Sequence, residues 1–170
     1  MKAIFYTILL AAVFLVGCEA SSTPVEQSSV VGTTGGQYLV DAEPANATPV
    51  GDARKDSSDG DKITLVGHIG GSTDPFVEGV AAFTIVDPKV PYCAPEEGCK
   101  TPWDYCCTQN DVKENIATVK IVDEAGKPVT EDARKLLGVK ELSLVVVEGT
   151  AKRDDQGNLS LLANKVYLKK

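Results

Sequence analysis

Beyond Asp61 the sequence alternates short runs of β-branched and apolar residues with turn residues, and this pattern limits the fold more than any other feature. The runs predict five strands, at residues 63–69, 80–86, 117–122, 142–150 and 159–168. A short helix is predicted at 130–138, because hydroxyl and acidic residues begin it and Gly138 ends it. We therefore predict a mainly β domain over residues 62–170.

The order of these elements, three strands, a helix and two strands, resembles the OB-fold, a five-stranded Greek-key barrel with a helix between its third and fourth strands. A small sandwich with the helix packed across one end is the alternative. The resemblance implies a binding module for oligonucleotides, sugars or proteins, and it does not select among them. Nucleic acid is the least favoured ligand, because the chain from Asp61 onward carries 14 basic and 17 acidic residues, and Phe83 alone supplies an aromatic on strands two and three.

The first 17 residues have the layout of a secretory signal peptide, with a charged start and an apolar middle that is short for a membrane span. Residues 15–18, Leu-Val-Gly-Cys, resemble the lipobox of bacterial lipoproteins. The resemblance implies cleavage before Cys18, acylation of that residue and anchoring in a membrane, on the periplasmic side of the outer membrane or at the cell surface. An ordinary cleaved signal peptide is the alternative.

Residues 18–61 are predicted to be a lipidated, disordered tether. The segment is rich in Ser, Thr, Pro, Gly and Ala, and its apolar residues follow no sustained period. A short apolar patch at 37–40 is interpreted as a chance cluster rather than a docking element. The tether is expected to hold the domain clear of the lipid surface.

An insertion at residues 87–115, between the second and third predicted strands, contains the four cysteines other than Cys18. They lie within 15 residues, with the spacing C-x5-C-x6-C-C. An exported chain meets an oxidising compartment, so two disulfides are predicted. Adjacent cysteines rarely pair with each other, which leaves two pairings open: Cys93 with Cys106 and Cys99 with Cys107, or Cys93 with Cys107 and Cys99 with Cys106.

The alternative for the same cysteines is a zinc or copper site, formed by Cys93, Cys99, Cys106 and Cys107 or by three of them with His68. Adjacent cysteines fit this alternative poorly, because zinc sites usually separate paired cysteines by two to four residues.

Three aromatic residues of the insertion, Tyr92, Trp103 and Tyr105, are candidates for recognition, since Trp and Tyr dominate binding hot spots. Packing of Trp103 over the disulfides or over an open barrel end is the alternative. The segment 101–107, Thr-Pro-Trp-Asp-Tyr-Cys-Cys, resembles one found in small bacterial lipoproteins of unknown function, and this implies no activity.

The sequence therefore predicts a non-enzymatic, lipid-anchored envelope protein that acts as a binding or structural module, with no cofactor. Its expected partners are the membrane and either an envelope protein or a small ligand. No Gly-rich phosphate loop, acid/base pair or nucleophile with a partner is recognised in the sequence. Metal binding by the insertion, and oligonucleotide or sugar binding on the barrel, are the alternative functions.

Overall fold

The computed structural model describes residues 35–170. The predicted signal peptide, the lipobox with Cys18 and the tether up to residue 34 lie outside this part of the chain. The elements that the structure describes, in chain order, are β1 (Thr48–Pro49), α1 (Val50–Asp56), β2 (Lys62–Ile69), β3 (Ala82–Val86), the 3-10 helices η1 (Pro95–Glu97) and η2 (Pro102–Asp104), α2 (Gln109–Glu114), β4 (Ile116–Ile121), α3 (Ala133–Leu137), β5 (Leu144–Arg153) and β6 (Leu159–Leu168). Within residues 35–170, every helix falls short of the length and apolar character that crossing a membrane requires.

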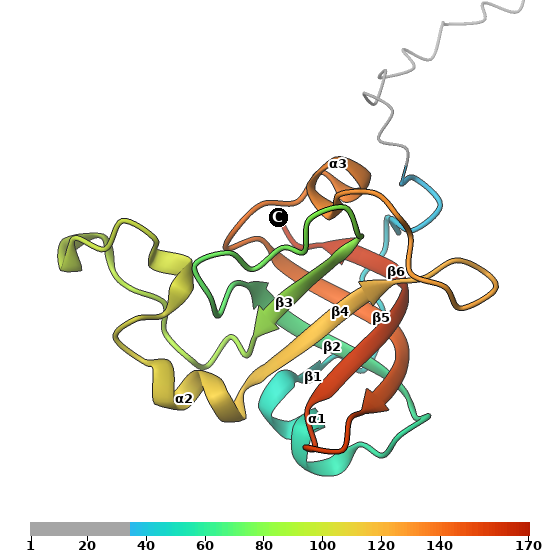
Figure 1. Cartoon of the computed structure of the whole chain (residues 1–170), viewed down its shortest axis with the longest axis horizontal. Helices are drawn as coiled ribbons and strands as arrows, with labels where there is room; N and C mark the ends of the chain where they lie inside the picture. Colours follow the sequence, from blue (N-terminus) through green and yellow to red (C-terminus); the bar gives the residue numbers. More distant parts are fainter. Residues whose placement is uncertain (1–34) are drawn as a thin grey trace, which may run out of the picture. The chain divides into compact units, whose positions relative to one another are not determined.

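Five of the strands close into a barrel (Figure 1). The order β2-β3-β4-β6-β5 returns to its start, because β5 also pairs antiparallel with β2 from Lys62–Thr150 to His68–Leu144. The β4–β6 pair is parallel and the other barrel pairs are antiparallel. This is the topology of the OB-fold, so the prediction of a mainly β, five-stranded Greek-key barrel is confirmed.

The barrel interior follows from the alternation of side chains along each strand. In β2, Leu65 and Ile69 point into the core and are fully buried, as the sequence pattern predicts. A bulge at Glu148/Gly149 adds one residue to β6 relative to β5 and strengthens the local bend. Gly149 is required there, since a Cβ atom would lie 2.2 Å from the carbonyl oxygen of Leu162.

The prediction of a disordered tether over 18–61 is wrong for residues 35–61, which pack against the barrel. Tyr38 is 7% exposed, and its carbonyl oxygen accepts a 2.7 Å hydrogen bond from the backbone N–H of Val166. The next element, β1, pairs in parallel with β2. Val50 and Ala53 of α1 belong to the main core, so a few well-placed apolar residues are enough to order this polar segment.

Helices α1 and α3 cover opposite ends of the barrel (Figure 1). Leu136 and Leu137 of α3 enter the same core as the buried residues of α1. The N-cap of α3 is Asp132, whose side chain accepts a hydrogen bond from the backbone N–H of Arg134, rather than the Thr130 hydroxyl expected from the sequence. The helix is correspondingly shorter than the predicted 130–138.

Two barrel residues hold the ends of α1. At its N-terminus, the backbone N–H of Gly51 donates a 2.7 Å hydrogen bond to the carboxylate of Asp87. At its C-terminus, Nη2 of Arg153 donates to the carbonyl oxygens of Arg54 at 2.6 Å and Ser57 at 2.9 Å. These bonds satisfy groups that a helix end leaves without partners, so the position of α1 depends on the barrel.

Replacement of Arg153 therefore tests whether hydrogen bonds from the barrel stabilise the position of α1. We expect Arg153→Ala to lower the free energy of unfolding by about 1.5–3 kcal/mol, the usual contribution of hydrogen bonds to a charged group. The neighbouring variant Lys152→Ala removes an ion pair with Asp59 whose side chains are 49% and 52% exposed, and it should cost about 0.5 kcal/mol or less. Urea unfolding measures both, and equal losses would contradict the role given to Arg153.

Candidate functional site

The insertion leaves the barrel at Asp87 and returns to it at Asn115. The backbone N–H of Asp87 donates a 2.9 Å hydrogen bond to the carbonyl oxygen of Asn115, which closes the base of the insertion. It contains three short helices, η1, η2 and α2, which the sequence analysis did not predict. It also has a small core of its own, formed by Val86, Val90, Tyr105 and Val112.

Trp103 fixes the insertion to the loop that follows β2. Its indole Nε1 donates a 3.0 Å hydrogen bond to the carbonyl oxygen of Thr73, and its own carbonyl oxygen accepts one of 2.8 Å from the backbone N–H of Gly71. Gly70 allows this close approach, because a Cβ atom there would lie 2.6 Å from the carbonyl oxygen of Trp103 and 2.9 Å from the Tyr105 ring. The sequence did not mark Gly70 as part of the site, since its Gly-Gly-Ser context indicates only a turn.

Tyr105 turns the chain so that the last two cysteines face the first. Its φ of 56° lies in the left-handed region, directly after η2. The backbone N–H of Cys106 then donates to Oδ1 of Asp104 at 2.8 Å, and the Thr108 hydroxyl donates to the carbonyl oxygen of Pro91 at 3.0 Å. The bond from Thr108 to Pro91 joins the turn after η2 to the segment before Cys93.

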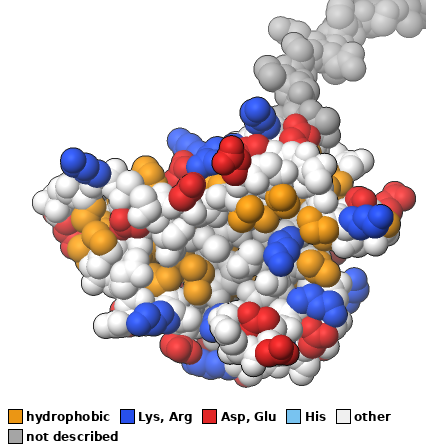
Figure 2. All heavy atoms as spheres, in the orientation of Figure 1, with side chains coloured by type: hydrophobic (Ala, Val, Ile, Leu, Met, Phe, Trp, Pro, Cys, Tyr) orange, Lys and Arg blue, Asp and Glu red, His pale blue; other side chains and the backbone are white. Residues whose placement is uncertain are grey.

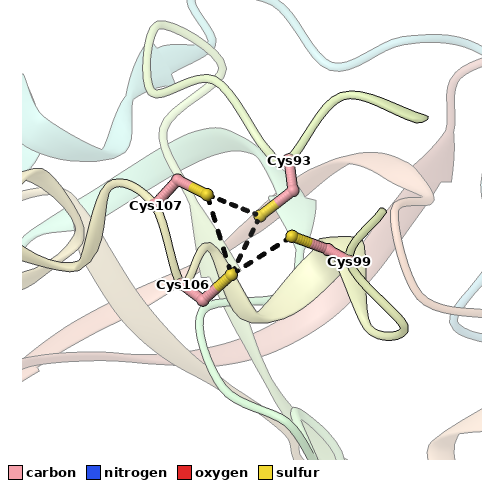
Figure 3. Close-up of side chains that lie close together, drawn as sticks. All are labelled: Cys93, Cys99, Cys106 and Cys107. Atoms are coloured by element: carbon pink, nitrogen blue, oxygen red, sulfur yellow. Dashed lines mark hydrogen bonds between the residues drawn. The ribbon is translucent and has the colours of Figure 1, made fainter. Parts of the chain in front are cut away.

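The four cysteine sulfurs form one compact cluster (Figure 3). The Sγ of Cys106 lies 3.4 Å from that of Cys93, 3.3 Å from that of Cys99 and 3.8 Å from that of Cys107. Cys93 and Cys107 are 3.8 Å apart, and all four atoms lie within 4.8 Å of one another. No disulfide joins the cysteines of residues 35–170 in the structure, so the two predicted disulfides stay a prediction.

The thiols of the cluster differ in pKa. A hydrogen bond from the backbone N–H of Cys107 lowers the pKa of Cys93. Hydrogen bonds with Cys99 and Cys93 raise the pKa of Cys106 far above its ordinary value. The hydrogen bond with Cys106 acts to lower the pKa of Cys99, but the contact with Cys93 and burial outweigh it and raise that pKa to about 11. Four neighbouring thiolates repel one another, so only a bound cation would stabilise all four.

The sulfur positions fit a single tetrahedral ion. A zinc–sulfur bond of about 2.3 Å gives sulfur–sulfur separations of about 3.8 Å in a regular tetrahedron. Four of the six separations, 3.3 to 3.8 Å, lie at or below this value, and the other two are within 4.8 Å. Among the described residues, these cysteines are the one group of His, Cys, Asp and Glu side chains placed to hold a metal ion. His68 is outside the group and packs edge-to-face on Tyr92, with ring centroids 5.7 Å apart.

The three aromatic residues proposed for recognition have different environments. Tyr92 is 44% exposed, and Trp103 is partly exposed while it anchors the insertion. The prediction for Tyr105 is wrong, because its left-handed backbone turns the ring into the core of the insertion, where it is fully buried. Burial raises its pKa to about 12, and its hydroxyl has no hydrogen-bond partner within residues 35–170.

No protein-family model matches the chain, and no curated protein matches it. The solved structures that match include the following two. A hypothetical protein, ygiW, from E. coli has a TM-score of 0.39 and 13% identity, over 79% of this chain and 99% of that one. The mitochondrial single-stranded DNA binding protein Rim1 from S. cerevisiae has a TM-score of 0.36 and 21% identity, over 66% of this chain and 98% of that one. The OB-fold assignment rests on the strand pairings of the chain itself.

The close approach at Gly70 gives a test of how the insertion is held. We expect Gly70→Ala to cost about 1–3 kcal/mol of stability, as overpacking does, and to shift the fluorescence of Trp103, the single tryptophan. Thr73→Ala is the matched control, because Trp103 bonds to the backbone of residue 73 and not to its side chain. A Gly70→Ala protein with unchanged stability and fluorescence would contradict this contact.

Proposed function

We propose that this chain is an exported, lipid-anchored OB-fold binding module whose ligand is a single metal ion held by Cys93, Cys99, Cys106 and Cys107. The observation that carries the proposal is the separation of the four sulfur atoms, all within 4.8 Å of one another. It reverses the preference drawn from the sequence, where disulfides ranked above a metal site.

The chemistry of the ligands favours Zn²⁺. Four sulfur ligands select borderline and soft ions over Mg²⁺ or Ca²⁺, which take oxygen. Tetrahedral sites of four thiolates are typical of Zn²⁺, and Cu⁺ shares the preference for thiolates. A cluster of several metal ions would spread its terminal sulfurs further apart than a single ion does. Zn²⁺ is therefore the ion that we propose, and Cu⁺ is the second ion to test.

The same geometry supports a non-enzymatic role. Catalytic zinc sites have three protein ligands and keep the fourth coordination position for water or substrate. A site with four protein ligands has no open coordination position. Nucleic-acid binding is not part of the proposal: Lys, Arg, Asp and Glu side chains are interspersed on the face shown in Figure 2, with no continuous basic stripe there. An envelope protein or small ligand remains a partner consistent with this module.

The proposed metal site predicts the mass and thiol chemistry of the purified full chain. We expect one zinc per chain by native mass spectrometry and metal analysis, and four thiols that react with an alkylating agent only after metal removal and denaturation. Cys93→Ser should weaken zinc binding by more than about 100-fold, since even changes beyond the ligands cost 10- to 100-fold. Lys113→Ala, an exposed change on α2, is the control and should bind zinc normally.

Disulfides would give the opposite result. A metal-free chain with a mass four hydrogens below the reduced value, and no alkylation after denaturation, would contradict the proposal. The sulfur distances then favour Cys99 with Cys106 and Cys93 with Cys107, at 3.3 and 3.8 Å, which peptide mapping would verify.

The proposed anchor has its own test. We expect the full chain to fractionate with membranes and to be extracted by detergent, because acyl chains on Cys18 hold it there. Cys18→Ala should lose the added mass of the acyl chains, whereas Cys99→Ser should keep it. A Cys18→Ala protein that still carries acyl chains would argue against lipidation at this residue.

A further inference from the structure

The four sulfur ligands differ sharply in their access to solvent. Cys93 is 2% exposed, and Cys99 is intermediate. Cys106 and Cys107 are both exposed. An ion held at the cluster is therefore covered on the Cys93 side and open to solvent on the side of the Cys106–Cys107 pair.

The two sides also differ in how their ligands are spaced along the chain. Backbone hydrogen bonds fix both sides: the N–H of Cys93 donates to the carbonyl oxygen of Pro102 at 3.3 Å, and the N–H of Cys106 donates to Oδ1 of Asp104 at 2.8 Å. Such surrounding hydrogen bonds orient and strengthen a metal ligand. Cys106 and Cys107 are consecutive residues, which departs from the separation of two to four residues that suits chelation of one ion. The exposed pair is thus the weaker half of the site.

We infer that the metal is cargo, exchanged with an acceptor that presents two thiolates, and that exchange begins at the Cys106–Cys107 pair. This inference rests on the proposed metal site. A site that only stabilised the fold would gain from burying its ligands, whereas this one places two of them at the surface. An acceptor with thiolates is favoured because it replaces sulfur with sulfur, which the preference of the ion for soft ligands requires.

Each exchange step is a ligand substitution without electron transfer. A thiolate of the acceptor forms a bond to Zn²⁺ while the bond from Zn²⁺ to Sγ of Cys107 breaks, and the released thiolate takes a proton from water. The second thiolate of the acceptor replaces Cys106 in the same way. Thiolates of a second acceptor molecule then replace Cys99 and, last, the buried Cys93, and each released thiolate takes a proton from water.

This inference is tested by measuring how fast the full, zinc-loaded chain loses zinc in detergent solution. Dithiothreitol and a peptide with a Cys-x-x-Cys sequence serve as thiolate acceptors, and EDTA serves as an oxygen and nitrogen acceptor. We expect the rate of loss to rise in proportion to the concentration of either dithiol and to exceed the EDTA rate by about tenfold or more at equal concentration. Rates that are the same for all three and independent of concentration would show spontaneous dissociation and overturn the inference.

Two variants compare the halves of the site. We expect Cys107→Ser to retain zinc and to lose it faster than the unaltered chain, and Cys93→Ser to retain none under the same conditions. Equal zinc occupancy in the two variants would overturn the proposed order of release. A chain that binds no zinc in its unaltered form would instead contradict the proposed function, so the two failures are distinguishable.

Discussion

The buried carboxylate of Asp87 joins the three parts of this molecule. It is 1% exposed; its Oδ2 accepts the backbone N–H of Gly51 in α1, and its Oδ1 accepts that of Lys89 at the start of the insertion. Its own backbone N–H binds Asn115, where the insertion ends. A buried charge is tolerated only with such partners. The end of β3, helix α1 and both ends of the insertion therefore meet at one residue, through its side chain and its backbone N–H.

The barrel was predictable because its signals are local. Alternating apolar residues define the strands, and β6 begins and ends at Leu159 and Leu168 as the pattern predicts. The order of elements then indicated the closed topology. The segment before residue 61 was missed because its burial depends on a surface that only the folded barrel provides. Sparse apolar residues such as Tyr38 and Val50 carry no periodic signal, yet each is buried.

The insertion shows a different limit. Cysteine spacing was enough to single out the four cysteines but not to choose between disulfides and a metal ion, because that choice depends on how the sulfurs are placed in space. The arrangement of the sulfur atoms depends on the left-handed backbone of Tyr105. It also depends on the indole of Trp103, which donates a hydrogen bond to a carbonyl group 30 residues earlier in the chain. Neither feature can be read from spacing. Likewise, the sequence shows Asp87 only as the polar end of a strand.

The packing of residues 35–61 on the barrel also bears on distance from a membrane. A fully extended chain spans at most about 3.5 Å per residue. With a lipid on Cys18, the 43 residues up to 61 would have allowed about 150 Å between the bilayer and the domain. Since the ordered domain begins by residue 35, the limit is about 60 Å. The start of the folded domain would then lie within that distance of the lipid surface.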